Sequence, residues 1–143
     1  MVAKREPSAY AVARLIKRAR RQMTNVLRER LAPLGTSLPV IQIIKRVVEQ
    51  GALNQLDLAR KIELEPSALC RIVVDLESKG LVIRERDPDD KRRVLVTATP
   101  AGEALLGRTQ PQMLAGLEAI ASRLTRSERT QLCRLLEKLV AGG

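Results

Sequence analysis

The chain has 143 residues, which is the size of one domain and enough to bury a core without disulfides or metal. It carries a formal net charge of +10, one aromatic residue, Tyr10, and no histidine. The lack of histidine excludes His-based triads and Cys/His zinc sites, and no Gly-rich phosphate loop is present, so we expect no enzyme, no cofactor and no metal site. Recognition by base stacking is also disfavoured, because it relies on aromatic side chains.

The two cysteines, Cys70 and Cys133, are far apart in the sequence and show no paired spacing. The N-terminus has no secretory hydrophobic segment, and no apolar run approaches the ~20 residues that cross a bilayer. We therefore expect a soluble, cytoplasmic protein with reduced thiols. Cys70 fits a half-buried, space-filling role better than a redox switch, and Cys133, within an apolar stripe, is expected in the core.

Positive charge is concentrated at the start of the chain, where residues 1–30 hold nine Lys or Arg and two acidic residues. Ser8 can cap a helix to about Ala32, whose apolar residues recur at three- and four-residue steps. The opposite face carries the basic residues Arg14, Lys17, Arg18, Arg20, Arg21, Arg28 and Arg30. This basic face is either solvated or close to DNA phosphates or an anionic ligand, and the sequence leaves both open.

Two further helices are expected next along the chain. Ser37 supplies the N-cap of a helix over residues 38–50, and Pro39 stiffens its first turn. This helix is apolar over much of its circumference, so it should be central to the core. Asn54 can cap a short helix over residues 55–62.

A fourth helix, over residues 66–79, has two different faces at 100° per residue. One face carries the apolar residues Leu69, Ile72, Val73 and Leu76. The other carries Ser67, Arg71, Val74 and Ser78. Small side chains and a single arginine suit a DNA major groove, because bulk would hold the helix backbone away from the bases.

The β-branched-rich runs 81–83 and 94–97 predict a hairpin, because an acidic, turn-forming cluster joins them. Residues 84–93 contain five basic and four acidic side chains. We interpret Asp87 and Asp90 as holding a basic neighbour extended for a narrow minor groove, the candidates being Lys91, Arg92 and Arg93. The alternative is a solvated hairpin whose local ion pairs contribute little.

Two helices complete the chain. Thr99 is expected to cap a helix that Pro111 kinks or divides, and a capping box of Thr125 and Glu128 starts the last helix. The apolar stripes of the first and last helices have no evident partner within so small a domain. The order of elements predicts a mainly α fold with a small β-hairpin wing, a winged helix-turn-helix whose second helix enters a major groove while the first braces it across the backbone.

The segment 57–102 resembles, almost without gaps, the MarR family of bacterial transcription regulators. The matching pieces are Asp57-Leu58-Ala59, Ser67 to Arg71, Leu76-Glu77-x-Lys79-Gly80-Leu81-Val82, Asp87-Pro88-x-Asp90-Lys91-Arg92, Thr99 and Gly102. The resemblance implies a single domain over residues 1–143. Within it, residues 36–99 form the winged helix-turn-helix DNA-binding region, and residues 1–35 and 100–143 supply dimerisation helices.

The resemblance also implies a homodimeric repressor that binds a pseudo-palindromic operator in double-stranded DNA. Together with the pattern of the residues, the resemblance predicts that the following residues contact DNA: Ser37, Asn54, Gln55, Ser67, Ala68, Arg71, Val74, Arg86, Asp90, Lys91 and Arg92. Arg92 is expected in the minor groove, braced by Asp90. The candidates for phosphate contact are Ser37, Asn54 and Gln55.

A small anionic or phenolic effector is implied as the signal that releases the repressor. We expect it to favour a spacing of the two recognition helices that does not fit DNA. Candidate effector contacts are Tyr10, Arg14 and Arg18, although Tyr10 fits packing near the dimer interface better than contact with a ligand. The alternative function is a winged-helix module for protein or RNA assembly, which predicts a monomer or heteromer that contacts its partner through the basic first helix.

Three departures from the family pattern have consequences. Val74-Asp75 replaces an acidic-then-basic pair, so an outward Val74 is expected to touch a thymine methyl group instead of forming a salt bridge. Ala98 stands where leucine is usual before the threonine that follows the wing. The first helix contains no cysteine, so the mechanism of the family's peroxide sensors is not carried over.

Overall fold

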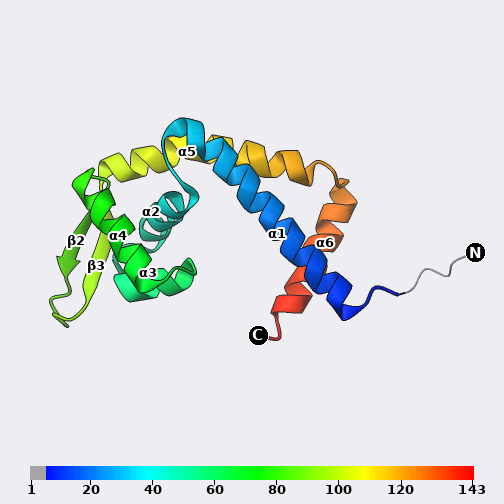
Figure 1. The fold of residues 1–143 in the computed structure, drawn as a ribbon, viewed down its shortest axis with the longest axis horizontal. Coiled ribbons are helices and arrows are strands. Elements are labelled where there is room, and N and C mark those ends of the chain that lie inside the picture. Colours follow the sequence, from blue (N-terminus) through cyan, green and yellow to red (C-terminus); the bar gives the residue numbers. More distant parts are fainter. Residues whose placement is uncertain (1–5) are drawn as a thin grey trace, which may run out of the picture. The chain divides into compact units, whose positions relative to one another are not determined.

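The computed structural model describes residues 6–143. The chain forms two compact units, one of residues 28–113 and one of residues 1–27 with 114–143. Two long helices, α1 (Ala9–Leu31) and α5 (Pro100–Ala121), supply residues to both units (Figure 1). Residues 1–5, which the sequence analysis assigned to a dimerisation segment, lie outside the described part of the chain.

The helices begin where the sequence predicts. Besides α1 and α5, they are α2 (Leu38–Gln50), α3 (Gln55–Lys61), α4 (Pro66–Ser78) and α6 (Arg126–Val140), and a short 3₁₀ turn covers Ala32–Leu34. Ser8 caps α1, since its Oγ accepts the N–H of Ala11 at 3.2 Å. Of the two outcomes expected at Pro111, a kink or a division of the helix, the division is wrong, because Pro111 lies inside a continuous α5. Proline removes one backbone donor, and the neighbouring turns keep theirs.

The wing belongs to a three-stranded antiparallel sheet, not to an isolated hairpin. The strands are β1 (Leu53–Asn54), β2 (Val82–Arg86) and β3 (Val94–Ala98), in the order β1-β3-β2. The sequence analysis missed β1, which pairs Leu53 with Val96 and Asn54 with Leu95. A two-residue strand has no alternation of its own and is defined only by its partner.

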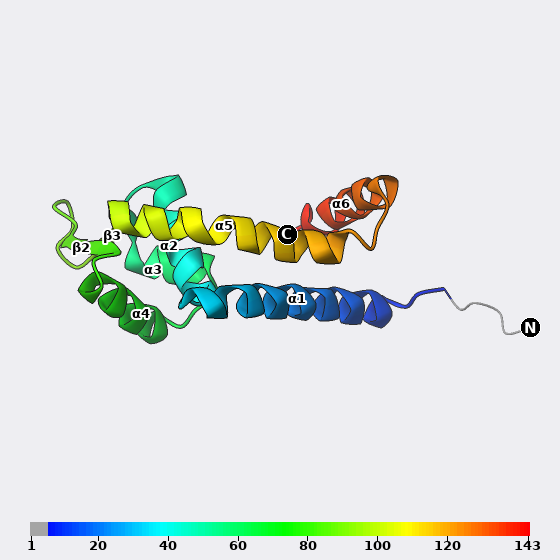
Figure 2. The ribbon, with the colours of Figure 1, turned by 90° about the horizontal axis from the view of Figure 1, so that it is seen from above.

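The core of the unit 28–113 is aliphatic and is built around α2, as expected. Helices α3 and α4 lie side by side, with β2 next to α4 (Figures 1 and 2). The buried side chains include Ile41, Ile43, Ile44 and Val47 of α2, Leu58 of α3, Leu69, Val73 and Leu76 of α4, Val82 of β2 and Val96 of β3. Since α2, α3, α4, β2 and β3 all contribute to this core, these elements are held together as one body.

The start of α5 is fastened to the link between α4 and β2. Thr99 donates its backbone N–H to the Leu81 carbonyl at 3.1 Å, and its Oγ1 accepts the N–H of Gly102 at 3.1 Å. Gly102 lies so close to Leu81 that a Cβ atom would overlap the Leu81 carbonyl oxygen. A glycine is therefore required for close packing at this position.

The second unit leaves apolar side chains exposed on α1 and α6. On α1 these include Leu15 and Ile16, and on α6 they are Leu132, Leu135, Leu136, Leu139 and Val140. The expectation that Cys133 lies in a core is wrong for the single chain, where it is exposed beside this stripe. The expected capping box of Thr125 and Glu128 is confirmed at the start of α6.

No helix among residues 6–143 is by itself long and apolar enough to cross a bilayer; only Ala9–Leu34 and Leu38–Gln50 taken together, across a sharp bend, meet that test of length and composition.

Candidate nucleic-acid interface

A tight turn sets the direction of α4 after α3. Asn54 caps α3, because its Oδ1 accepts the N–H of Leu56 at 2.8 Å. At the other end, Leu64 donates its N–H to the Ala59 carbonyl at 2.9 Å, and Glu63 adopts a left-handed conformation with φ of 56°. This is the hydrogen-bond pattern of a Schellman motif, with Glu63 where glycine is usual. Pro66 then opens α4 at a position whose missing N–H costs nothing.

The two faces of α4 are those that the sequence predicts. Leu69, Val73 and Leu76 are buried, whereas the side chains that project outward are Ser67, Arg71, Val74, Asp75 and Ser78. Val74 is 43% exposed, so a branched apolar group stands on the outer surface among small polar ones. Ala68 and Cys70 are half-buried at the borders of this face. The exposed face offers one guanidinium, hydroxyl groups and a methyl surface, which are the groups that distinguish bases in a major groove.

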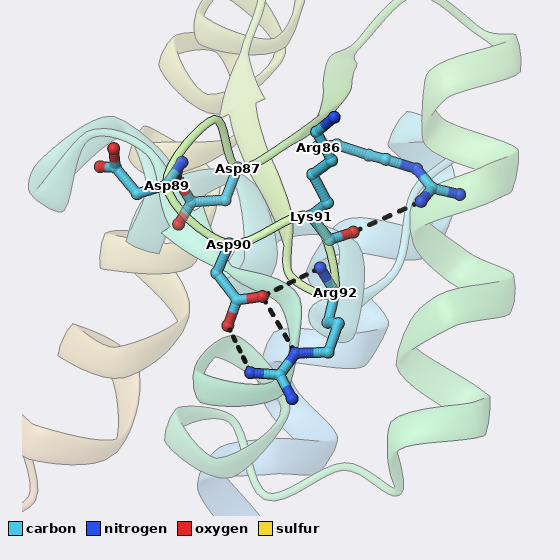
Figure 3. A network of polar contacts seen from close by, with 6 residues as sticks. All are labelled: Arg86, Asp87, Asp89, Asp90, Lys91 and Arg92. Atoms are coloured by element: carbon cyan, nitrogen blue, oxygen red, sulfur yellow. Dashed lines mark hydrogen bonds and ion pairs between the residues drawn. The ribbon is translucent and has the colours of Figure 1, made fainter.

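The wing tip is ordered by its own aspartates. Asp87 accepts the N–H of Asp89 at 2.9 Å, and its own N–H donates to the Arg93 carbonyl at 2.9 Å. Asp90 Oδ1 accepts both the backbone N–H and the Nε–H of Arg92 at 3.1 Å (Figure 3). The expectation that Asp90 holds Arg92 is therefore confirmed. These hydrogen bonds, first the side-chain one, keep the pKa of the Asp90 carboxyl below its ordinary value of 3.8.

Arg92 is held and yet open to solvent. Its side chain is 91% exposed, while that of Asp90 is 34% exposed. On the other side of the tip, Arg86 Nη1 lies 3.4 Å from the Lys91 carbonyl oxygen (Figure 3). An extended, pre-oriented guanidinium loses less side-chain entropy on binding than a free one, which suits insertion into a narrow minor groove.

Two contacts that tie the wing to the helices escaped the sequence analysis. Arg93 Nη2 lies 3.8 Å from a carboxylate oxygen of Asp57 at the start of α3. Glu77, near the end of α4, accepts the backbone N–H of Arg84 at 3.0 Å and pairs with its guanidinium at 3.3 Å. The matching pieces of the family pattern include Glu77 but not Arg84, and no local rule pairs residues seven positions apart in different elements.

The three candidates for phosphate contact differ in their surroundings. Ser37 is exposed at the N-cap position of α2, and its side chain makes no capping hydrogen bond. Gln55 is half-buried, and its Oε1 has no hydrogen-bond partner among the described residues. Asn54 is only 9% exposed and uses its Oδ1 to cap α3, which leaves it little surface for a phosphate.

A cleft of about 870 Å³ opens beside α4, within the unit 28–113. Residues that line it include Thr36 and Ser37 before α2, Ala68 and Arg71 of α4, Lys79 just after α4, and Arg108 of α5. Thr36 Oγ1 is buried without a hydrogen-bond partner in the described chain. Asp75 also lines the cleft and pairs with Lys79 at 2.9 Å. The cleft thus combines the guanidinium groups of Arg71 and Arg108 and an unsatisfied hydroxyl with apolar walls, a combination that fits a small organic anion.

The candidate effector residues lie elsewhere. Tyr10, Arg14 and Arg18 are exposed on the part of α1 that belongs to the other unit, and Tyr10 is 89% exposed. None of the three lines the cleft. Effector contacts at Tyr10, Arg14 and Arg18 therefore stay a prediction that is separate from this cleft.

Comparison with known proteins places these elements in a family. The model of the MarR family matches residues 37–94, which cover the helix-turn-helix and the wing up to β3. An HTH-type transcriptional repressor of Mycobacterium tuberculosis is 30% identical over 109 residues, which are 76% of this chain and 78% of the repressor. The chain belongs to the MarR family. It is a winged helix-turn-helix transcription regulator that binds DNA.

One further relative matches by sequence, and two solved structures match by superposition. A putative transcriptional regulatory protein for the hcr operon of Thauera aromatica is 30% identical over 73% of this chain, and the match spans 63% of that protein. A cysteine-to-serine variant of MarR from E. coli, solved in complex with operator DNA, superposes with a TM-score of 0.80 at 27% identity, over 90% of this chain and 93% of the other. CouR from Rhodococcus jostii, solved with p-coumaroyl-CoA, gives a TM-score of 0.75 at 25% identity, over 90% of each chain.

Proposed function

We propose that this MarR-family protein is a homodimeric repressor that binds an inverted-repeat operator and is released by a small anionic or phenolic effector. The observation that carries the proposal is the pairing, within one unit, of an outward polar face on α4 with a wing tip that presents Arg92. Such a protein acts by binding and has no need of catalytic residues. Because operator DNA is its partner, we expect it in the cytoplasm.

The proposed DNA contacts divide by role. Ser67, Ala68, Arg71 and Val74 read the major groove, and Arg92, held by Asp90 and flanked by Arg86 and Lys91, enters the minor groove. Ser37 and Gln55 are proposed near phosphates. Asn54, which caps α3, is the third residue proposed near phosphates.

Operator selection tests this function. A duplex selected from a random pool should carry an inverted repeat and bind with about a thousandfold or greater preference over a scrambled duplex of equal length at the same salt concentration. Equal affinity for both duplexes would reject sequence-specific regulation and would favour the assembly module.

The dimer is supported by the uncovered apolar residues of α1 and α6, since exposed stripes of this kind mark interfaces. We propose that residues 1–35 and 100–143 form the dimer, and that residues 36–99 read DNA, within one functional domain over 1–143. Sedimentation equilibrium should give twice the mass of 15.9 kDa. A monomer that still bound an inverted repeat cooperatively would contradict this arrangement.

The effector is proposed to bind in the cleft beside α4. Arg71 and Arg108 supply positive charge for a carboxylate or phenolate, while Lys79 is paired with Asp75 at 2.9 Å. The apolar walls suit an aromatic or aliphatic body. The structure of CouR with p-coumaroyl-CoA provides a precedent for small-molecule binding in a protein of this fold. A thermal-shift screen of aromatic and aliphatic acids, followed by operator release with each hit, tests the proposal; Arg108→Ala should weaken both effects.

A further inference from the structure

Glu77 holds both the backbone and the side chain of one wing residue. Its Oε2 accepts the backbone N–H of Arg84 at 3.0 Å. Its Oε1 accepts from Nε and Nη2 of the same arginine at 3.4 and 3.3 Å. The two side chains are partly shielded from solvent, with 38% of Glu77 and 29% of Arg84 exposed. An exposed ion pair contributes little, but this one also satisfies a backbone donor.

The position of Arg84 in the sheet explains why its N–H needs this partner. β2 is an edge strand, because the order of the sheet is β1-β3-β2. The Arg84 N–H points to that edge and is capped there by Glu77. An edge strand without such a cap presents an unpaired donor and is less firmly placed.

The same contact lies at the base of the wing, and the pair of Arg93 with Asp57 at 3.8 Å is a second link between the wing and the helices. Arg84 lies three residues before Asp87, where the tip begins, or about 10 Å along the strand. A small tilt of β2 at Arg84 therefore becomes a larger displacement of Arg92 at the tip. Among residues 6–143, no other side-chain hydrogen bond joins α4 to β2.

We propose that Glu77 is a positioning residue, which fixes the wing relative to α4 so that the major-groove and minor-groove contacts form together. This inference rests on the proposed contact of Arg92 with the operator. Glu77 itself touches no base and no phosphate in this role. It acts through Arg84, first by the backbone N–H and second by the guanidinium.

Three variants separate these two links. Glu77→Ala removes both, Glu77→Gln keeps an acceptor oxygen but loses the charge, and Arg84→Met removes the guanidinium while the backbone N–H remains available to Glu77. The loss of exchange protection in the wing and the loss of operator affinity should therefore be largest for Glu77→Ala and smaller for the other two variants. The matched control is Glu118→Gln, which breaks another arginine–glutamate pair, to Arg129 at 3.0 Å, in the other unit.

Hydrogen exchange of the free protein gives the first test. In Glu77→Ala, the amides of residues 84–93 should exchange about tenfold faster or more, while the amides of α2 keep their protection. Glu118→Gln should leave the wing unchanged. Wing exchange that is the same in Glu77→Ala and the wild type would overturn the proposal. If Glu77→Ala does not fold, Glu77→Gln is measured in its place by the same criterion.

A double-mutant cycle on operator affinity gives the second test. Arg92→Ala alone should weaken binding about tenfold, but less than about twofold in the Glu77→Ala background, because a misplaced wing no longer delivers Arg92. If the fold-loss of affinity in the double variant equals the product of the losses in the two single variants, the positioning role is contradicted. If Arg92→Ala alone has no effect, the proposed wing contact fails, and the exchange result by itself decides the role of Glu77.

Discussion

Arg92 is the residue whose side chain is both fixed by a partner and almost fully exposed, so its removal tests the wing directly. We expect Arg92→Ala to weaken operator binding by about 1–3 kcal/mol, the scale of a good groove contact. Arg123→Ala, which removes an exposed arginine from the other unit, is the charge-matched control. Fluorescence anisotropy at fixed salt should show a much smaller loss for the control; equal losses would mean that Arg92 contributes only net charge.

The ion pair of Asp90 with Arg92 should make the wing tip sensitive to pH. Hydrogen bonds from Arg92 lower the pKa of Asp90, so the folded protein favours the ionised carboxylate. The resulting stabilisation of the tip is present above the ordinary pKa of 3.8 and is lost as the pH falls through the lower folded pKa. An NMR titration should give Asp90 a pKa below 3.8, and Arg92→Ala should raise it. An unchanged Asp90 pKa in that variant would show that Arg92 does not hold the carboxylate in solution.

At the scale of elements, two glycines of α5 provide a comparison within one helix. Gly102→Ala should lower the free energy of unfolding by about 1–3 kcal/mol, because a Cβ atom would overlap the Leu81 carbonyl oxygen. Gly107→Ala meets nothing within 4 Å and should raise the stability by about 0.5–1 kcal/mol, since alanine favours the helix. Urea denaturation measures both; a stabilising Gly102→Ala would mean that α5 does not pack against the link between α4 and β2.

The elements that the sequence predicted are those that local chemistry determines. Ser8, Asn54 and the capping box at Thr125 start their helices through bonds to residues two or three positions away. The two faces of α4 follow from its period alone. By contrast, β1 and the bond from Glu77 to Arg84 depend on segments brought together by the tertiary fold, which no local pattern encodes.

The errors at this scale have physical causes as well. Cys133 was placed in a core because its helix carries an apolar stripe, but a stripe shows only that a face is suited to burial. The single chain leaves that face uncovered. The cleft could not be predicted in the same way, because its lining comes from the segment before α2, from α4 and from α5, and the sequence does not reveal that these converge. The effector contacts expected at Arg14 and Arg18 stay a prediction.

For the whole molecule, the cleft and the proposed DNA surface share residues. Ser37, Ala68 and Arg71 line the cleft, and the same three are proposed DNA contacts. A ligand that occupies Arg71 there removes the guanidinium from the major groove. This differs from the expectation drawn from sequence, in which the effector acts by changing the spacing of two recognition helices.

A titration distinguishes the two mechanisms. If effector and operator exclude each other, the apparent operator Kd should rise in proportion to effector concentration without a plateau. If the effector shifts a conformational equilibrium, the rise should stop at the ratio of its affinities for the two states, about 5–150-fold in typical cases. We expect no plateau, because effector and operator both need the guanidinium of Arg71. Calorimetry with operator-saturated protein provides the reciprocal check: effector binding should be abolished, whereas merely weakened binding to the DNA complex would establish linkage between separate sites.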